Sequence, residues 1–265
     1  MGFEVFQVDA FTDVPFQGNP AAVCLLPGPW TERGMQALAR EMNVSETAFV
    51  YRQMDGFSLR WFTPVKEVKL CGHATLASAH VLYETGLLHR NKPITFHTLS
   101  GELQAISVAE WLHIDLPAEP PESAVLPKNL TEALGIGTPV FTGKNRLDYM
   151  VALHSATEVR SLQPDFSLLA KAIPSAGVIV TSLSDVPEYD YICRYFDPGE
   201  GIDEDPVTGS AHCCLGPYWK KITSRDTLVA QQASRRGGVL HVTPGDNRVI
   251  LSGQAVTVWK GELTI

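Results

Sequence analysis

The sequence has no apolar run that approaches the roughly 20 residues a membrane-spanning helix needs. Its first residues, MGFEVFQVDAF, include Glu4 and Asp9 and alternate like a strand, whereas a signal peptide has a basic start and an apolar run. N-myristoylation of Gly2 is not expected, because Phe6 stands where the motif needs Ser or Thr. These absences predict a cytoplasmic protein with no membrane partner.

Cysteines and basic residues are also few. The five cysteines are odd in number, irregularly spaced and without a C-x-x-C motif, which favours reduced thiols over a disulfide framework or a structural metal site. The 21 basic residues are outnumbered by 29 acidic ones, which gives a formal net charge of −8. The chain therefore lacks the basic surplus with which proteins bind nucleic acid or anionic membranes.

The composition is that of a packed, turn-rich protein. The hydrophobic fraction of 45% and the charged fraction of 19% are compatible with an ordered core. The 265 residues correspond to one large domain or two small ones. The 21 glycines and 18 prolines argue against a helical bundle or a coiled coil.

An internal repeat divides the chain into two halves. The segment RWFTPVKEVKLCGHA, from Arg60, is similar to RYFDPGEGIDEDPVTGSA, from Arg194. Both open with Arg-aromatic-Phe-x-Pro and close on x-Gly-x-Ala, and the second copy has three extra residues in between. Weaker matches on both sides keep the same order. The repeat predicts two related units, joined near the proline-rich segment Leu116–Lys128.

Each half is predicted to combine strands with two helices. In the first half we expect strands at 4–10, 21–26, 48–51, 58–62, 94–98, 103–108 and 111–116, and helices after Thr31 and over 74–85. In the second half we expect strands at 149–153, 178–181, 191–196, 228–232, 239–242, 248–252 and 256–259, and helices over 165–173 and from Gly209. An interruption of the last helix is expected at Gly216-Pro217, because proline lacks the N–H donor and clashes with the preceding turn.

In both copies a strand leads through x-Gly-x-Ala into a helix. A helix N-terminus carries unpaired N–H groups and the positive end of the helix dipole, and glycine lets a ligand approach the backbone. Two such helix starts facing one another could hold a small anion, most simply a carboxylate. Ordinary capping by a side chain is the plainer alternative.

Four polar side chains lie in or near these segments: Glu46, His73, Asp205 and Ser210. Glu46 stands in SETAFV, directly before an apolar strand, where a carboxylate could transfer protons. Plainer alternatives exist. Glu46 could lie in a solvated turn, His73 could bond a loop carbonyl, Asp205 could cap a turn, and Cys71 could be a small buried apolar residue.

The sequence resembles the phenazine-biosynthesis PhzF-like family, which has the diaminopimelate epimerase-like fold. The matching segments span nearly the whole chain: VDAFTDVPFQGNPAAV, SETAFV, FTPVKEVKLCGHATLASAHVL, EDPVTGSAHCCLG and SGQAVTVWKGEL. The resemblance implies an α/β (α+β) fold of two pseudo-symmetric lobes, each a mostly antiparallel sheet wrapped around a central helix, with the active site between them. We expect an N-terminal lobe over 1–120, joined by the last strand at about 254–265, and a C-terminal lobe over 129–253.

The resemblance also implies a cofactor-independent isomerase that needs no metal and forms a homodimer. The characterised phenazine enzyme moves a proton along the ring system of trans-2,3-dihydro-3-hydroxyanthranilate. By motif position its catalytic glutamate corresponds to Glu46, and its histidine, aspartate and serine correspond to His73, Asp205 and Ser210.

The same resemblance implies how a small anionic substrate is bound. The backbone around Gly72 and Gly209 would hold its carboxylate, and Asn19 would line the same cleft. No nucleic-acid partner is implied.

Two other functions stay open. The epimerase relatives use two cysteines, one from each lobe, and Cys71 occupies the place of the first. The second place holds Thr208, whose hydroxyl has far too high a pKa to replace a thiolate. Thr208 disfavours two-cysteine chemistry, but because Cys71 is present, an amino-acid racemase or epimerase that uses Cys71 is kept as the second hypothesis. A non-catalytic small-molecule-binding protein of the same fold is the third.

Overall fold

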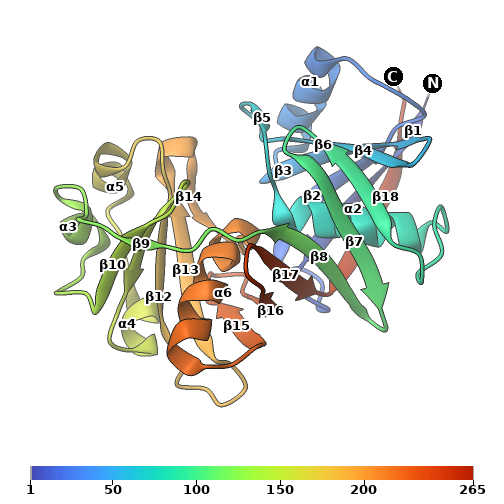
Figure 1. Ribbon diagram of the computed structural model, residues 1–265. Coiled ribbons are helices and arrows are strands. Elements are labelled where there is room, and N and C mark those ends of the chain that lie inside the picture. The colour runs from blue at the N-terminus through green and yellow to red at the C-terminus, as the bar shows by residue number, and fades with distance from the viewer. Residues whose placement is uncertain (1, 265) are drawn as a thin grey trace. The chain divides into compact units, whose positions relative to one another are not determined.

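The computed structural model describes residues 2–264 and divides the chain into two compact units (Figure 1). The first unit comprises Met1–Leu116 and Ile250–Ile265, and the second comprises Pro117–Val249. Most strand pairs within each unit are antiparallel, so the architecture is mixed α/β, as predicted.

The first unit places one buried helix against a curved set of strands. Its helices are α1 (Glu32–Met42) and α2 (Gly72–Glu84). Its strands are β1 (Phe3–Ala10), β2 (Asn19–Leu25), β3 (Glu46–Gln53), β4 (Gly56–Phe62), β5 (Glu67–Val68), β6 (Ile94–Thr98), β7 (Gly101–Val108), β8 (Trp111–Pro117) and β18 (Ala255–Leu263). Helix α2 packs against β1, β2, β3, β7 and β18 and is buried on nearly every side, which explains its almost uniformly small and apolar sequence.

The second unit has more short elements. Its helices are α3 (Leu130–Leu134), α4 (Ala156–Ser161), α5 (Phe166–Ala172) and α6 (Gly209–Thr223), with a 3₁₀ turn at Pro198–Glu200. Its strands are β9 (Glu122–Ser123), β10 (Phe141–Lys144), β11 (Tyr149–Ala152), β12 (Val178–Leu183), β13 (Tyr191–Asp197), β14 (Ile202–Asp205), β15 (Leu228–Gln232), β16 (Gly238–Pro244) and β17 (Arg248–Gly253), whose last residues belong to the first unit. The sequence did not predict α3, α4 and β10, because elements this short show no clear periodicity.

The strand pairing confirms the repeat. In the first unit β2–β3 is parallel, β3–β4 antiparallel, β4–β6 parallel and β6–β7 antiparallel. The same sequence of pairings recurs in the second unit as β11–β12, β12–β13, β13–β15 and β15–β16. Helices α2 and α6 follow at equivalent places, so the two units repeat one topology.

The arginine that opens each repeat makes the same contacts in both units. Arg60 forms two hydrogen bonds with Glu67, both of 2.6 Å, and Arg194 forms two with Glu204, of 2.7 and 2.9 Å. Each guanidinium also lies over the phenylalanine two residues further along its strand, at 5.2 and 4.9 Å from the ring centre. The three extra residues of the second copy therefore lie between its arginine and its glutamate.

The predicted interruption of the last helix is wrong, because α6 continues through Pro217 to Thr223. Proline cannot donate to the carbonyl of Cys213, four residues earlier, but that carbonyl accepts a hydrogen bond of 3.0 Å from the Glu119 N–H instead. At Gly216 an added Cβ would lie 2.8 Å from Val242 Cγ1. Gly216 therefore lets α6 pack closely against β16. The Cys213 carbonyl keeps a hydrogen-bond partner although Pro217 cannot donate to it.

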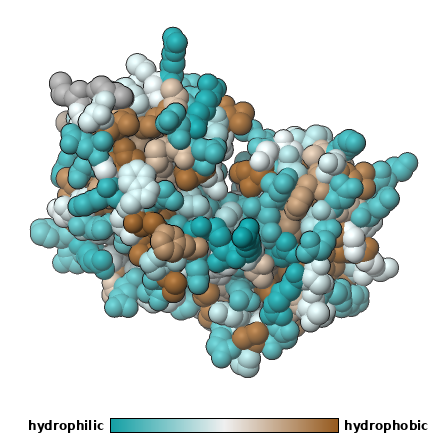
Figure 2. All heavy atoms as spheres, turned by 180° about the vertical axis from the view of Figure 1, so that it is seen from behind, coloured by the Kyte–Doolittle hydropathy of each residue, from teal (hydrophilic) through white to brown (hydrophobic). Residues whose placement is uncertain are grey.

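Among the described residues, no helix combines the length and the apolar character that crossing a bilayer requires. On the face shown in Figure 2, apolar side chains are scattered among polar ones. Single exposed apolar residues of this kind are normal on a folded protein surface.

The two arginines provide a matched test of burial. The Arg194 side chain is 10% exposed and also donates to the backbone carbonyl of Leu162 at 2.8 Å, whereas the Arg60 side chain is 26% exposed. We expect Arg194→Met to lower the free energy of unfolding by about 3 kcal/mol, because Glu204 and the carbonyl lose a buried partner. Arg60→Met should cost about 1 kcal/mol. Equal losses in urea unfolding would contradict this difference.

Candidate active site

The first group of candidate residues lies where two parallel strands begin. Strands β2 and β3 start at Asn19 and Glu46, and their register places Ala21 opposite Glu46. Helix α2, which packs against both strands, starts at Gly72. The topology therefore brings Asn19, Glu46 and His73 together, although 54 residues separate the first from the last.

The His73 ring is surrounded by these side chains. Its Nε2 lies 3.2 Å from Glu46 Oε2, and its Nδ1 lies 3.2 Å from Asn19 Nδ2 and 3.5 Å from Cys71 Sγ. The side chains of His73 and Glu46 are only 5% and 13% exposed. The plainer alternatives for Glu46 and His73 are therefore wrong, because neither a solvated turn nor a loop carbonyl accounts for these contacts.

The contact between His73 and Glu46 is close but not a well-directed hydrogen bond. Both His73 Nε2 and Glu46 Oε2 are buried, and neither has a hydrogen-bond partner among residues 2–264. A buried polar atom without such a partner is costly, so it marks a place where a bound molecule can complete the hydrogen bonding. The two atoms are therefore candidates for contact with a bound molecule.

Burial and charge act on His73 in opposite directions. Burial lowers its pKa, but the Cys71 sulfur and the Glu46 carboxylate raise it, and the net result is a pKa well above 6.5. Burial also raises the pKa of the Cys71 thiol to about 11, so this group is protonated at neutral pH. The Glu46 carboxylate is therefore the partner that favours a charged His73 ring under ordinary conditions.

Glu46, Cys71 and His73 also form a group whose ligand atoms lie within 4.8 Å of one another. The carboxylate faces Nε2 of the ring, whereas the sulfur is close to Nδ1. Since the two nitrogens of one imidazole point in different directions, this arrangement does not fit a single ion held by all three groups.

The second group lies where α6 begins. Asp205 ends β14, Thr208 is the residue before the helix, and Gly209 and Ser210 are its first two residues. The Asp205 carboxylate is buried and accepts a hydrogen bond of 2.5 Å from the Thr208 hydroxyl. The plainer alternative for Asp205, a local turn contact, is thus correct in part, whereas Ser210 makes no side-chain hydrogen bond within the described chain.

Neither central helix is capped by the side chain that precedes it. Thr31, Ser155 and Asp165 each accept a hydrogen bond from the first turn of their helix, but Cys71 and Thr208 do not. Ordinary capping is therefore wrong as an explanation of both x-Gly-x-Ala segments. The hydroxyl of Thr208 in particular makes no bond to the first-turn N–H groups of α6.

The two units differ at the position of the carboxylate. Measured from the repeated arginines, the strand registers make Gly177, just before β12, the equivalent of Glu46. A Cβ added at Gly177 would lie 2.2 Å from the hydroxyl oxygen of Tyr195. That hydroxyl instead donates to the buried carboxylate of Asp148 at 2.9 Å. The second unit consequently has no room for a counterpart of Glu46.

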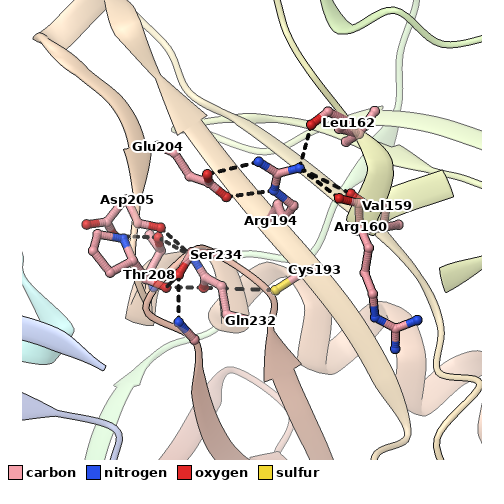
Figure 3. A network of polar contacts seen from close by, with 12 residues as sticks. Val159, Arg160, Leu162, Cys193, Arg194, Glu204, Asp205, Thr208, Gln232 and Ser234 are labelled. Atoms are coloured by element: carbon pink, nitrogen blue, oxygen red, sulfur yellow. Dashed lines mark hydrogen bonds and ion pairs between the residues drawn. The ribbon is translucent and has the colours of Figure 1, made fainter. Parts of the chain in front are cut away.

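The structure also places a residue at α6 that the sequence analysis missed. Gln232, at the end of β15, is fully buried and hydrogen-bonded to both Asp205 and Thr208 (Figure 3). The only signal in the sequence was a polar residue at the end of an apolar strand. Asn19, Gly72 and Gly209 lie where the sequence placed them, each at the start of a strand or helix.

The duplicated topology and the two uncapped central helices define a protein of the diaminopimelate epimerase-like fold. A probable proline racemase of Agrobacterium radiobacter shares this fold at 10% identity, with a TM-score of 0.67 over 99% of this chain and 93% of that one. Residues 8–261 match the model of the phenazine biosynthesis-like protein family, PhzC-PhzF, and the chain belongs to this family.

Two nearer relatives agree with the family assignment. A PhzF-family phenazine biosynthesis protein of Enterococcus faecalis is 40% identical, with a TM-score of 0.93 over 100% of both chains. A protein of Halalkalibacterium halodurans, named as an uncharacterized isomerase, is 51% identical over 262 residues, which cover 98% of each chain. The resemblance noted in the sequence and the predicted fold are both confirmed.

The raised pKa of His73 predicts a pH dependence of stability. A raised folded-state pKa stabilises the folded protein below the unfolded value of 6.5, and this contribution is lost as the pH rises through the raised value. The free energy of unfolding of the wild type, relative to His73→Gln, should therefore fall as the pH is raised from about 6 to about 9. Urea unfolding at each pH measures it.

The exposed His89 provides the control, because His89→Gln should show no such trend relative to the wild type. A wild-type advantage over His73→Gln that stays constant or grows with pH would contradict the charge assignment for His73.

Proposed function

We propose that this protein is a cofactor-independent isomerase that shifts a proton on a small carboxylate-bearing substrate, with Glu46 as the general acid and base. The observation that carries this proposal is the buried contact of 3.2 Å between Glu46 Oε2 and His73 Nε2. The relative from Halalkalibacterium halodurans supports the reaction class, because it is 51% identical and is named as an isomerase.

One carboxylate can perform both halves of a proton shift. Glu46 takes a proton from one carbon as a base and returns it to another carbon on the same face as an acid. A substrate atom that bonds His73 Nε2 fixes the substrate beside Glu46. The equivalent of Glu46 in the second unit is Gly177, which is consistent with one proton carrier acting on one face.

The substrate carboxylate is proposed to bind the uncapped helix starts. The N–H groups around Gly72 in the first unit and those around Gly209 in the second are each proposed as donors for an anion, and Asn19 supplies a side-chain amide beside His73. Asp205 and Ser210 complete the proposed set by holding polar substrate groups. Local donors of this kind are needed, because the chain as a whole carries a net charge of −8.

The racemase hypothesis is the weaker one. Burial raises the pKa of Cys71 to about 11, whereas a catalytic thiolate requires a lowered pKa. The place of a second cysteine is taken by Thr208, whose hydroxyl is bonded to Asp205 and Gln232. The proposal of a non-catalytic binding protein gains no support from a buried acid and imidazole held 3.2 Å apart.

Glu46→Gln tests the proposal directly. The amide keeps the shape of the side chain but cannot accept a carbon-bound proton, so solvent deuterium incorporation should fall at least about 100-fold. The probe is trans-2,3-dihydro-3-hydroxyanthranilate in D₂O, and incorporation into the probe or its product is followed by NMR and mass spectrometry. The exposed Glu41→Gln is the matched control and should retain wild-type rates. Full incorporation by Glu46→Gln would exclude Glu46 as the proton carrier.

Cys71→Ser separates the proposal from the racemase hypothesis. Because the thiol is protonated and its sulfur lies beside Nδ1 rather than Glu46, this variant should keep proton transfer within about threefold of the wild type. Racemisation of free amino acids, measured by polarimetry, should be undetectable in the wild type. A loss of about 1,000-fold in Cys71→Ser, together with amino-acid racemisation in the wild type, would favour the thiol as the catalytic base.

A further inference from the structure

Gln232 connects β15 to the segment that leads into α6 (Figure 3). Its amide Nε2 donates to the backbone carbonyl of Asp205 at 2.9 Å and to Thr208 Oγ1 at 3.2 Å. Its Oε1 accepts from the Thr208 N–H at 2.9 Å. The side chain is completely buried, and both of its N–H donors are in use. Three points of a single turn, from Asp205 to Thr208, are thus fixed by one amide.

The neighbouring Ser234 adds a fourth point, because its hydroxyl donates to the Pro206 carbonyl at 2.8 Å. On the other side of the turn, Arg194 holds Glu204, the residue before Asp205, by two hydrogen bonds. The turn is therefore restrained along its whole length, but the amide of Gln232 is the group that reaches Thr208.

The contact of Gln232 with Thr208 decides what the threonine hydroxyl can do. A threonine before a helix ordinarily accepts a hydrogen bond from the N–H of the second or third helical residue. Here the hydroxyl accepts from Gln232 and donates to Asp205 Oδ2 at 2.5 Å, and it makes no capping bond. The same bonds that orient the Asp205 carboxylate therefore keep the threonine away from the first-turn N–H groups of α6.

This arrangement belongs to the second unit alone. The pairing of β4 with β6 and of β13 with β15 makes Thr98 the equivalent of Gln232. The Thr98 hydroxyl bonds the carbonyl of Gly101, three residues further on, and not the segment before α2. The amide is consequently not a requirement of the shared topology.

We propose that Gln232 is a positioning residue for the substrate site: it orients Asp205 and withholds the Thr208 hydroxyl from capping α6, so that the first N–H groups of the helix stay available to a substrate carboxylate. This inference rests on the proposed function. It predicts that removing the amide impairs ligand binding or turnover even though Gln232 touches no substrate.

Gln232→Leu is the first variant, and Gln231→Leu is its matched control. Gln231 is the neighbouring residue of the same strand and points to the other face of β15, where it makes no hydrogen bond to the α6 segment. Amide hydrogen exchange at Thr208, measured by NMR, reports the lost bond directly. Anthranilate, an amino-substituted aromatic carboxylate, is the binding probe in calorimetry, and deuterium incorporation into trans-2,3-dihydro-3-hydroxyanthranilate gives kcat and KM.

We expect faster exchange at Thr208, and at least tenfold weaker anthranilate binding or at least tenfold lower kcat, in Gln232→Leu and not in Gln231→Leu. Faster exchange with unchanged affinity and unchanged kcat would overturn the proposal, because the amide would then be merely structural. If the wild type incorporates no deuterium, the proposed function fails for this probe, and anthranilate affinity alone decides the positioning role: a tenfold loss supports it and an unchanged affinity overturns it.

Gln232→Glu provides a test that does not depend on how well the leucine variant folds. A protonated carboxyl can still donate to Asp205 or Thr208, whereas an ionised one cannot and repels the Asp205 carboxylate. The other titratable groups facing this position are Cys193 and His212. Burial lowers the pKa of His212 to about 4 and raises that of Cys193, so both stay neutral near pH 7.

The activity or affinity of Gln232→Glu, relative to the wild type, should therefore decline as the pH rises through the pKa of the introduced carboxyl. Thr208→Ser should retain the wild-type behaviour. Thr208→Val loses the bond to the Asp205 carboxylate and should therefore lower kcat as Gln232→Leu does, but it has no hydroxyl that could cap α6 and should keep more of the anthranilate affinity than Gln232→Leu. A ratio of Gln232→Glu to wild type that does not change with pH would contradict a role for the donated hydrogen bonds.

Discussion

The proposed site depends on the N-termini of helices α2 and α6, which the preceding side chains do not cap. Helices α2 and α6 are the central helices of their units, and neither is capped by an ordinary hydrogen bond from the side chain that precedes it. Helices α1, α4 and α5 are capped by Thr31, Ser155 and Asp165, whereas the short helix α3 lacks a side-chain cap, as α2 and α6 do. The candidate catalytic residues lie at or beside these two helix starts: Glu46 and His73 at α2, and Asp205 and Ser210 at α6.

The two units share a scaffold and differ in the side chains placed on it. Arg60 and Arg194 make equivalent bidentate bonds, which shows that the common part is structural. At the ends of the strands the units diverge. The position of Glu46 is Gly177 in the second unit, and the position of Gln232 is Thr98 in the first. One unit thereby supplies an acid beside an imidazole, and the other supplies a rigidly held aspartate and threonine.

Much of this could be predicted from the sequence, because the repeat and the alternation of apolar residues are strong local signals. The starts of α1 and α5 followed from Thr31 and Asp165, and the long strands followed from their patterns. The contacts of Gln232 could not be predicted, since nothing in LVAQQ indicates which backbone groups its amide will meet. Likewise, the close approach of Tyr195 to Gly177 depends on the pairing of β12 with β13, which periodicity alone does not specify.

The hydrogen bond from Glu119 to the Cys213 carbonyl has a consequence for how α6 forms. In an isolated peptide with the sequence of 209–223, Pro217 would leave that carbonyl to water and would favour two short helical turns over one helix. In the protein, the partner comes from a segment 94 residues earlier in the chain. The length of helix α6, which carries Gly209 and Ser210, therefore depends on a tertiary hydrogen bond. Docking of the polypeptide that follows β8 stabilises the helix at its full length.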